Sequence, residues 1–406
     1  MNIKKPIRVL YSFPHKLGSD RICTTAWQQV NGLATAGADV TVFPGVLQKP
    51  LSKELGVHVR PTLARGKYRI PYKLLGRMRA LKLHDYIVSR RLEKMAGEID
   101  VVHTWPLGAL ATLKTARRLG IATVLERPNA YTRFAYEVVR LECEKLGISM
   151  PPDHEHAFNA EYLAREEEEY KAADYLACPS DFVMKTFLDA GYSREHLIRH
   201  QYGFDEKQFT LDKSTVRNKR PFMMLFVGGV APRKGLHYAL EAWLNSPASQ
   251  DGNFVIAGGF LPSYKEKLAP MLAHPSIKAL GHRKDIAELM RESDVLVLPS
   301  IEEGSALVTS EARGCGCVLV VSDAAGAICK HMVNALVHHV GDVQALTEHI
   351  TMLHDNPDFL ERLRAESIRT ANELTWTTAG EKLLETYRTL VNEHKMKQTR
   401  PLVLSP

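Results

Sequence analysis

The chain has 406 residues, which is more than one ordinary hydrophobic core holds, so the length predicts two domains. With 45% hydrophobic and 24% charged residues, the composition excludes a disordered or fibrous chain, and no apolar run approaches the ~18 residues of a membrane span. The net charge of +7 is too mild to select a partner. Six scattered cysteines lack paired zinc spacing, and residues 1–6 lead directly into a strand-like run. We therefore expect reduced thiols in a cytoplasmic protein without a signal peptide.

The first half of the chain alternates short apolar runs, which predict strands, with helical patterns that end at glycines. Strands separated by helices are typical of parallel βαβ units in a sheet covered on both faces. The acidic run 166–169 is interpreted as the solvated face of a further helix. The predicted strands are residues 7–12, 40–43, 101–103, 123–125 and 176–179, and the predicted helices are residues 23–36, 107–119 and 182–190.

Segment 60–94 holds eleven Lys or Arg residues against Asp85 and Glu93, so its charge is +9 and that of the rest of the chain is −2. Apolar residues recur there at helical spacing and predict a basic amphipathic helix. One interpretation is a core-facing stripe with a solvated basic back. The other is a docking face for a phosphorylated acceptor or for an anionic membrane surface, the inner face of the cytoplasmic membrane. We expect no nucleic acid partner, because no recognised binding motif accompanies the charge.

A polar stretch, residues 206–220, predicts a linker, and the strand–helix pattern restarts after it. We therefore expect an α/β protein of two doubly wound, Rossmann-like domains that face each other across a cleft. In such sheets ligands bind beyond the carboxyl ends of the strands. The second half is predicted to contain strands at residues 223–227, 254–257, 294–299 and 318–321, a helix from residue 236 and a helix over residues 286–291.

The segment after the strand at 223–227 is the first candidate site. Gly228 and Gly229 allow a ligand to approach the backbone, and Arg233 and Lys234 offer a guanidinium fork and a point charge that suit a diphosphate. The alternative is a plain strand–helix turn with two exposed cations.

Glu303 and Glu311 form the second candidate site, eight positions apart across a strand end and into a helix. Two carboxylates there could accept hydrogen bonds from sugar hydroxyls. The alternative is a helix cap at Glu303 and a solvated Glu311. A third candidate, the turn that contains His282, could line a base pocket or be a simple loop.

Several residues of the first half are expected at the cleft because they follow predicted strands. The loop around Gly18 follows the first strand, His103 ends another, and Glu126, Arg127 and Asn129 follow a third. His103 could be structural or catalytic. A lone histidine is more often structural, and both interpretations stay open.

Together these segments resemble family 4 of the retaining nucleotide-sugar glycosyltransferases, which have the GT-B fold. Residues 173–180 resemble the strand before the family's linker, and residues 202–205 resemble its Asn-Gly-Val-Asp turn. The spacing Glu303-x7-Glu311, followed by residues 312–316, is similar to its most specific signature.

The resemblance implies roles for these residues. Arg233 and Lys234 would clamp the donor diphosphate, Glu311 would hold the donor ribose, and Glu303 would contact the transferred sugar. The residues implied on the donor side are Gly18, Gly229, His282, Gly304, Ser305, Ala306 and Leu307, and the candidates on the acceptor side are His103, Glu126, Arg127 and Asn129.

The resemblance also implies a division of the chain: an acceptor-binding domain at residues 1–205, a nucleotide-sugar domain at 206–375 and a helix at 376–395 that crosses back. The chain departs from many members in two places. Gly304-Ser305-Ala306 stands where they have Gly-Phe-Gly, and Glu126-Arg127-Pro128-Asn129 where they carry a histidine. No Asp-x-Asp motif occurs, so we expect no cofactor and no metal, with Arg233 and Lys234 in the place of the cation.

The implied function is transfer of a hexose-type sugar, with retention, from a nucleotide diphosphate sugar to a glycan, lipid-linked or small-molecule acceptor in cell-surface glycan or glycolipid biosynthesis. The alternatives are a GT-B phosphorylase, a nucleotide-sugar epimerase or a catalytically silent, membrane-associated homologue. The products of the reaction would separate these enzymes.

Overall fold

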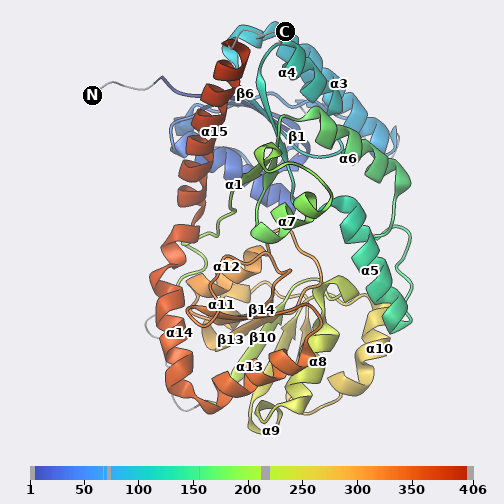
Figure 1. Ribbon diagram of the computed structural model, residues 1–406, viewed down its shortest axis with the longest axis vertical. Coiled ribbons are helices and arrows are strands. Elements are labelled where there is room, and N and C mark those ends of the chain that lie inside the picture. Colours follow the sequence, from blue (N-terminus) through green and yellow to red (C-terminus); the bar gives the residue numbers. More distant parts are fainter. Residues whose placement is uncertain (1–4, 67, 71–74, 155, 212–219, 400–406) are drawn as a thin grey trace, which may run out of the picture.

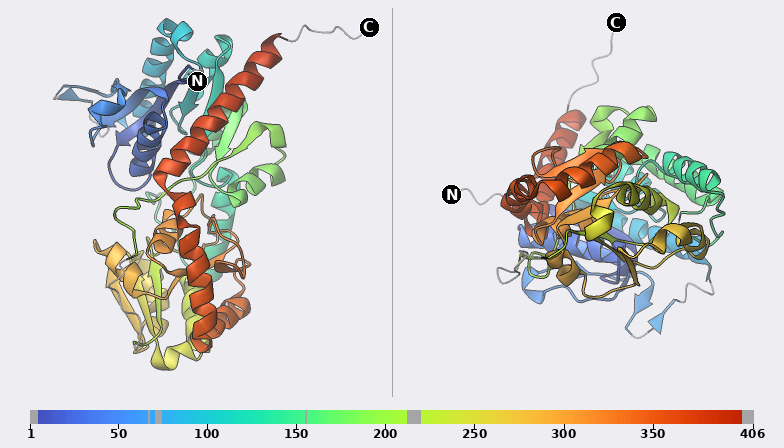
Figure 2. Two further views of the ribbon diagram at one scale, coloured as in Figure 1. Left: turned by 90° about the vertical axis from the view of Figure 1, so that its left-hand side faces the viewer. Right: turned by 90° about the horizontal axis from the view of Figure 1, so that it is seen from below.

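The structure is a computed structural model that describes residues 5–66, 68–70, 75–154, 156–211 and 220–399. These residues form two α/β domains stacked along the long axis of the molecule (Figure 1). The C-terminal helix, α15 (Trp376–Thr399), returns from the second domain along the side of the first (Figures 1 and 2).

The first domain is built on a parallel sheet with the strand order β3-β2-β1-β6-β7-β8-β9. Its strands are β1 (Arg8–Leu17), β2 (Asp39–Leu47), β3 (His58–Val59), β6 (Val101–Thr104), β7 (Ala122–Glu126), β8 (Tyr175–Cys178) and β9 (Leu197–Arg199), with the short antiparallel pair β4 (Ala64–Arg65) and β5 (Tyr68–Arg69) beside it. Its helices are α1 (Ile22–Thr35), α3 (Arg77–Lys94), α4 (Leu110–Arg118), α5 (Thr132–Leu146), α6 (Ala160–Ala172) and α7 (Asp181–Asp189).

The second domain is built on a parallel sheet with the strand order β12-β11-β10-β13-β14-β15. Its strands are β10 (Met223–Val227), β11 (Asn253–Ala257), β12 (Ile277–Gly281), β13 (Val295–Leu298), β14 (Val318–Ser322) and β15 (Ala335–His338). Its helices are α8 (Leu236–Asn245), α9 (Ala248–Asp251), α10 (Pro262–Leu272), α11 (Ile286–Glu292), α12 (Leu307–Gly314), α13 (Val343–Asp355) and α14 (Pro357–Arg369).

Both sheets are doubly wound, as predicted. The strand order reverses between β1 and β6 in the first sheet and between β10 and β13 in the second. Loops after these four strands border the cavity between the domains, which is where ligands bind in open parallel sheets. β1 is longer than the predicted strand at 7–12 because it continues, through an irregularity in its pairing with β2 between Phe13 and Lys16, to Leu17.

Helix α15 completes the core of the first domain. Its residues Leu383, Leu384 and Tyr387 are at most 3% exposed and belong to the same apolar cluster as the strands of the first sheet. α15 and α1 approach closely where two glycines meet, since a Cβ atom on Gly380 would lie 2.4 Å from the carbonyl carbon of Gly32. The first domain is thus built from both ends of the chain.

The two segments that join the domains lie side by side. Phe204 donates its N–H to the carbonyl oxygen of Leu374 (2.9 Å) and accepts the N–H of Trp376 (3.3 Å), which makes an isolated bridge between Phe204 and Thr375. Gly203 lies against this crossing, where a Cβ atom would be 2.4 Å from the nitrogen of Trp376.

The predicted basic amphipathic helix is α3. Its apolar stripe faces the core, with Met78, Leu81, Val88 and Leu92 at most 8% exposed, while most of its cations are exposed; Leu74 lies outside the described residues. The core-facing interpretation of the stripe is therefore confirmed.

The acidic run 166–169 is not a solvated face, which corrects the prediction. Glu169 is buried and accepts the N–H groups of Leu107 (2.6 Å) and Ala109 (3.0 Å). It thereby supports the turn before α4, where Leu107 has a φ of 70° and the helix begins three residues later than predicted. Burial raises the pKa of Glu169 to about 8, although the two backbone hydrogen bonds and the charge of Arg165 lower it.

We predict that Gly380→Ala destabilises the protein by about 1–3 kcal/mol, because the added methyl group separates α15 from α1 and overpacks the junction. Gly97→Ala is the matched control, since nothing lies within 4 Å of a Cβ atom there. Thermal denaturation of both variants measures the effect, and equal melting temperatures would contradict the close contact.

Candidate functional site

A cavity of about 910 Å³ lies between the two domains at the carboxyl ends of both sheets. This volume is in the range of small-molecule sites. The first domain contributes residues that include His15 within the irregularity of β1, Trp105 after β6 and Tyr136 of α5. The second domain contributes the loops after β10 and β13 and the first turns of α12. We call this cavity the cleft.

Arg233 and Lys234 line the cleft and are paired with two carboxylates, a set of four that we call the ionic cluster. Nη1 of Arg233 lies 3.1 Å from Oε2 of Glu302 and 3.2 Å from Oε2 of Glu303, and it donates to the carbonyl oxygen of Glu302 (2.8 Å). Lys234 pairs with Glu303. The side chains of both cations are at most 14% exposed, so the alternative of two exposed cations is wrong.

The charges of the ionic cluster balance, since two cations face two carboxylates. An anionic ligand would have to take the place of a carboxylate beside at least one cation. Burial raises the pKa of Glu303, but Arg233 and Lys234 outweigh that effect and hold it below the ordinary value. Burial lowers the pKa of Lys234, and Glu303 opposes this only in part.

A glycine-dependent turn packed on the loop after β13 holds the cations in place. Arg233 and Lys234 lie in a single 3-10 turn, Pro232–Lys234, which ends at Gly235 with a φ of 65°. A Cβ atom on Gly235 would lie 2.0 Å from the carbonyl oxygen of Pro299, so only glycine allows this turn to pack on the end of β13. The N–H of Ile301 closes the contact by donating to the carbonyl oxygen of Arg233 (2.9 Å).

The loop after β13 touches the first domain directly. Glu302 accepts the N–H of Ala130 (3.0 Å), and the hydroxyl of Ser180 donates to the carbonyl oxygen of Gly304 (2.5 Å). A Cβ atom on Gly304 would lie 1.6 Å from the carbonyl oxygen of Pro128. Gly304 is therefore a point of close contact between the domains as well as a residue of the cleft.

Glu311 lines the cleft from α12 and is half-buried. Burial raises its pKa to about 7. Within the described residues, no hydrogen bond or ion pair is found to the carboxylate of Glu311. Such a group suits a ligand hydroxyl, because it gains a partner only when a donor enters the cleft.

Three of the four residues predicted on the acceptor side are placed elsewhere. His103, Glu126 and Arg127 are at most 1% exposed and do not line the cleft, whereas Asn129 does. Tyr387 of α15 covers His103, the segment after β9 covers Glu126, and α6 covers Arg127 through Glu166 and Tyr170, which explains the difference.

Glu126 is instead the centre of a buried polar network. It accepts hydrogen bonds from Gln29 (3.0 Å) and Tyr202 (3.0 Å) and is bonded to Nε2 of His200 (2.8 Å). His103 stacks on Tyr11 and is bonded to the hydroxyl of Tyr387 in α15 (2.6 Å). The burial of His103 favours the structural interpretation over the catalytic one.

The other predicted donor-side residues divide into two groups. Ser305, Ala306 and Leu307 line the cleft, and Gly229 lines an adjoining pocket with Arg233 and Lys234. Neither Gly18 nor His282 lines either cavity.

Close neighbours of these two residues do line the cleft. Arg21 lies three positions after Gly18, and Lys284 lies two after His282. Arg77 of the basic segment and His156 were not predicted at the site, and both line the cleft. The sequence has no periodic pattern that predicts these four residues at the site. They lie outside the strands, and only the tertiary structure brings them to the cleft.

Comparisons with known proteins support the fold. Residues 221–356 match the family described as glycosyl transferases group 1. Among solved structures, sucrose-phosphate synthase of Thermosynechococcus elongatus has a TM-score of 0.68 at 17% identity and covers 96% of this chain and 100% of its own. Anabaena HepE in complex with UDP-glucose has a TM-score of 0.65 at 16% identity and covers 94% and 100%. The chain has the GT-B fold and resembles the family 4 glycosyltransferases.

A curated relative is the N,N'-diacetylbacillosaminyl-diphospho-undecaprenol alpha-1,3-N-acetylgalactosaminyltransferase of Campylobacter jejuni. It is 28% identical over 172 residues, which are 42% of this chain and 44% of that protein. The chain thus matches less than half the length of this relative.

The described residues contain neither a metal-binding cluster nor a membrane-spanning helix. No group of three or more His, Cys, Asp or Glu side chains there is arranged to hold a metal ion. None of the helices in that part of the chain combines the length and apolarity needed to cross a membrane.

We predict that Glu311→Gln stabilises the ligand-free protein at about pH 8 but not at about pH 5. A carboxyl group whose pKa is raised to about 7 binds its proton more tightly in the folded state, so its contribution to stability is full below its unfolded pKa and is lost as the pH rises through 7. We expect a gain of about 1–2 kcal/mol at the higher pH, measured by urea denaturation at both values. An equal effect at the two values would show that Glu311 is not buried as described.

Proposed function

We propose that the chain is a retaining glycosyltransferase that moves a hexose-type sugar from a nucleotide diphosphate sugar to a glycan, lipid-linked or small-molecule acceptor. The observation that carries this proposal is the meeting of Arg233, Lys234, Glu303 and Glu311 in one interdomain cleft. Anabaena HepE, a protein of similar fold, was solved with UDP-glucose. UDP-glucose is therefore the first donor to test.

In this proposal the second domain binds the donor. The diphosphate takes the place of Glu303 beside Arg233 and Lys234, and the released carboxylate turns toward the hydroxyls of the sugar. Glu311 accepts hydrogen bonds from the ribose. Strong hydrogen bonds between a guanidinium and phosphate oxygens compensate for the lost ion pairs.

Stabilising the leaving group then dominates the barrier. As the bond between the anomeric carbon and the phosphate oxygen breaks, negative charge grows on the diphosphate, next to Arg233 and Lys234. The acceptor hydroxyl attacks from the face that the diphosphate leaves, its oxygen bonds to the anomeric carbon, and its proton passes to the leaving phosphate oxygen. The configuration is retained, and neither a protein base nor a metal is required in this scheme.

The first domain supplies the acceptor side. Arg21, Arg77 and Asn129 line the cleft from the first domain, so they are the groups that would meet the acceptor. They replace the buried His103, Glu126 and Arg127 in this role. Approach of the two domains would exclude water and protect the donor from hydrolysis.

We predict that Arg233→Ala lowers turnover about 10²- to 10³-fold, the loss expected for one strong donor to the transition state. Release of the nucleotide from a panel of nucleotide sugars, with UDP-glucose first, measures turnover. Lys267→Ala, on the exposed surface of α10, is the control and should keep full activity. Because Arg233 is buried with Glu302, both variants are checked for folding by circular dichroism. A folded Arg233→Ala variant with near-normal turnover would remove the cation from the mechanism.

We also propose that the outer face of α3 binds an anionic membrane surface in the cytoplasm. Arg79, Lys82 and Arg90 are exposed along this face, and Tyr86, at 59% exposure, lies among them at helical spacing. Basic residues with an interfacial aromatic are typical of helices that lie on membranes.

We predict that Arg79→Glu/Arg90→Glu lowers binding to vesicles with anionic lipid at least about tenfold, since each near-surface cation contributes about 1 kcal/mol. Lys265→Glu/Lys267→Glu makes the same change of charge on α10 and should bind as the wild type does. Sedimentation with anionic and with neutral vesicles measures binding. Equal loss in both variants would point to net charge rather than to α3.

A further inference from the structure

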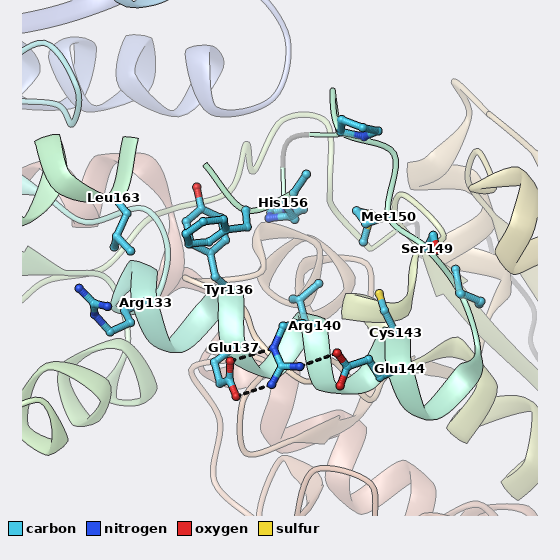
Figure 3. A pocket seen from close by; sticks show the side chains of 15 residues that line it. Arg133, Tyr136, Glu137, Arg140, Cys143, Glu144, Ser149, Met150, His156 and Leu163 are labelled. Carbon is cyan, nitrogen blue, oxygen red and sulfur yellow. Dashed lines mark hydrogen bonds and ion pairs between the residues drawn. The ribbon is translucent and has the colours of Figure 1, made fainter. Parts of the chain in front are cut away.

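A second cavity, of about 880 Å³, lies on the first domain beside the cleft (Figure 3). It is bordered by α5, by the chain between α5 and α6, and by Leu163 of α6. We call it the α5 pocket. In Figure 3 the side chains of Tyr136 and His156 lie at its centre, above α5.

The lining of the α5 pocket is mainly apolar. Val139 and Cys143 of α5 line it and are at most 6% exposed, because they also pack in the apolar core of the second domain, and Ile148 and Met150 border it from the following segment. Phe158, at 67% exposure, packs edge-on against Tyr136 with ring centroids 5.4 Å apart. Such a lining offers contact to an apolar group and leaves part of an aromatic ring in water until that group arrives.

The charged side chains at the α5 pocket are already paired within the protein. Arg140 forms ion pairs with Glu137 and Glu144 on the same helix (Figure 3), and Arg133 pairs with Glu167 of α6 (2.7 Å). A charged ligand would have to break these pairs. An uncharged apolar group would not, so the pocket favours the latter.

The α5 pocket adjoins the cleft. Tyr136 and His156 line both cavities, and His156 also lines the adjoining pocket that contains Gly229, Arg233 and Lys234. A single molecule that extends past the side chains of Tyr136 and His156 would have one end in the cleft and the other in the α5 pocket. The part in the cleft meets polar side chains, and the part in the α5 pocket meets apolar ones.

We propose that the α5 pocket binds the apolar part of an amphiphilic acceptor, whose hydroxyl-bearing end reaches the cleft. This inference rests on the proposed function. The donor does not fit the pocket, because a nucleotide diphosphate sugar has no apolar group of this size and its diphosphate is assigned to Arg233 and Lys234. The acceptor is the remaining substrate, and the pocket lies on the first domain, the side assigned to it. The preferred acceptors are thus alkyl or aryl glycosides and lipid-linked glycans rather than free sugars.

The experiment compares octyl β-D-glucopyranoside, below its micelle concentration, with methyl β-D-glucopyranoside. Binding to the full chain is measured by isothermal titration calorimetry without donor. We expect the octyl compound to bind at least about tenfold more tightly, because each buried methylene contributes favourably. Equal affinity for the two compounds would overturn the proposal.

Two variants locate the octyl group. Phe158→Ala removes an exposed wall of the pocket, and Ser149→Trp fills it from an exposed position. Each should weaken octyl binding at least about fivefold. Their controls are Leu188→Ala on α7 and Leu141→Trp on the same α5, both at exposed positions that line neither cavity, and both should bind as the wild type does. Unchanged octyl binding in Phe158→Ala and Ser149→Trp would place the ligand elsewhere and overturn the proposal.

Binding of UDP-glucose to the same variants separates this inference from the proposed function. It should be unchanged in Phe158→Ala, because Phe158 does not line the cleft. If the wild type binds no nucleotide sugar but shows the expected octyl pattern, the transferase proposal fails while the apolar site stands. If nucleotide sugars bind and release nucleotide without any preference for the octyl compound, the site fails and the transferase proposal stands.

Discussion

The arrangement of the site depends on the two contacts that the carboxylate of Glu302 makes. It is fully buried, and one oxygen accepts the N–H of Ala130 from the first domain while the other pairs with Arg233 of the second. A buried carboxylate without partners is costly, so all three groups are held in one geometry. One contact between the domains and the position of the cation are therefore set by the same side chain.

This coupling makes the ionic cluster sensitive to the arrangement of the domains. If the domains separate, Ala130 and Ser180 lose their partners on the loop after β13, and Glu302 is left to Arg233 alone. If an anion enters the cleft, Arg233 interacts with both the anion and Glu302. A ligand that interacts differently with the two arrangements shifts the population between them. Gly304, which has no room for a side chain against Pro128, keeps the closed arrangement sterically possible.

The repeating parts of the molecule could be predicted from the sequence, because buried parallel strands are continuous apolar runs. The strand at 223–227 agrees with β10 at both ends. Contacts between loops that are distant in the sequence have no such pattern in the sequence. The contact between Arg233 and Glu302 joins positions 69 apart, and the burial of Glu169 depends on a turn sixty positions before it. His103 lies one residue before the end of β6 rather than at it, and Tyr387 of α15 covers it, which only the tertiary structure reveals.

The crossing at Phe204 and Thr375 has a consequence for how such a chain can change during evolution. Because the polypeptide leaves the first domain and re-enters it at neighbouring points, everything between them is an insertion whose ends already meet. Recombination at these points would exchange the second sheet and leave the first intact. The transplanted unit would need a residue without a side chain opposite Pro128, a carboxylate within reach of Ala130, and a surface that fits Val139, Glu142 and Cys143 of α5.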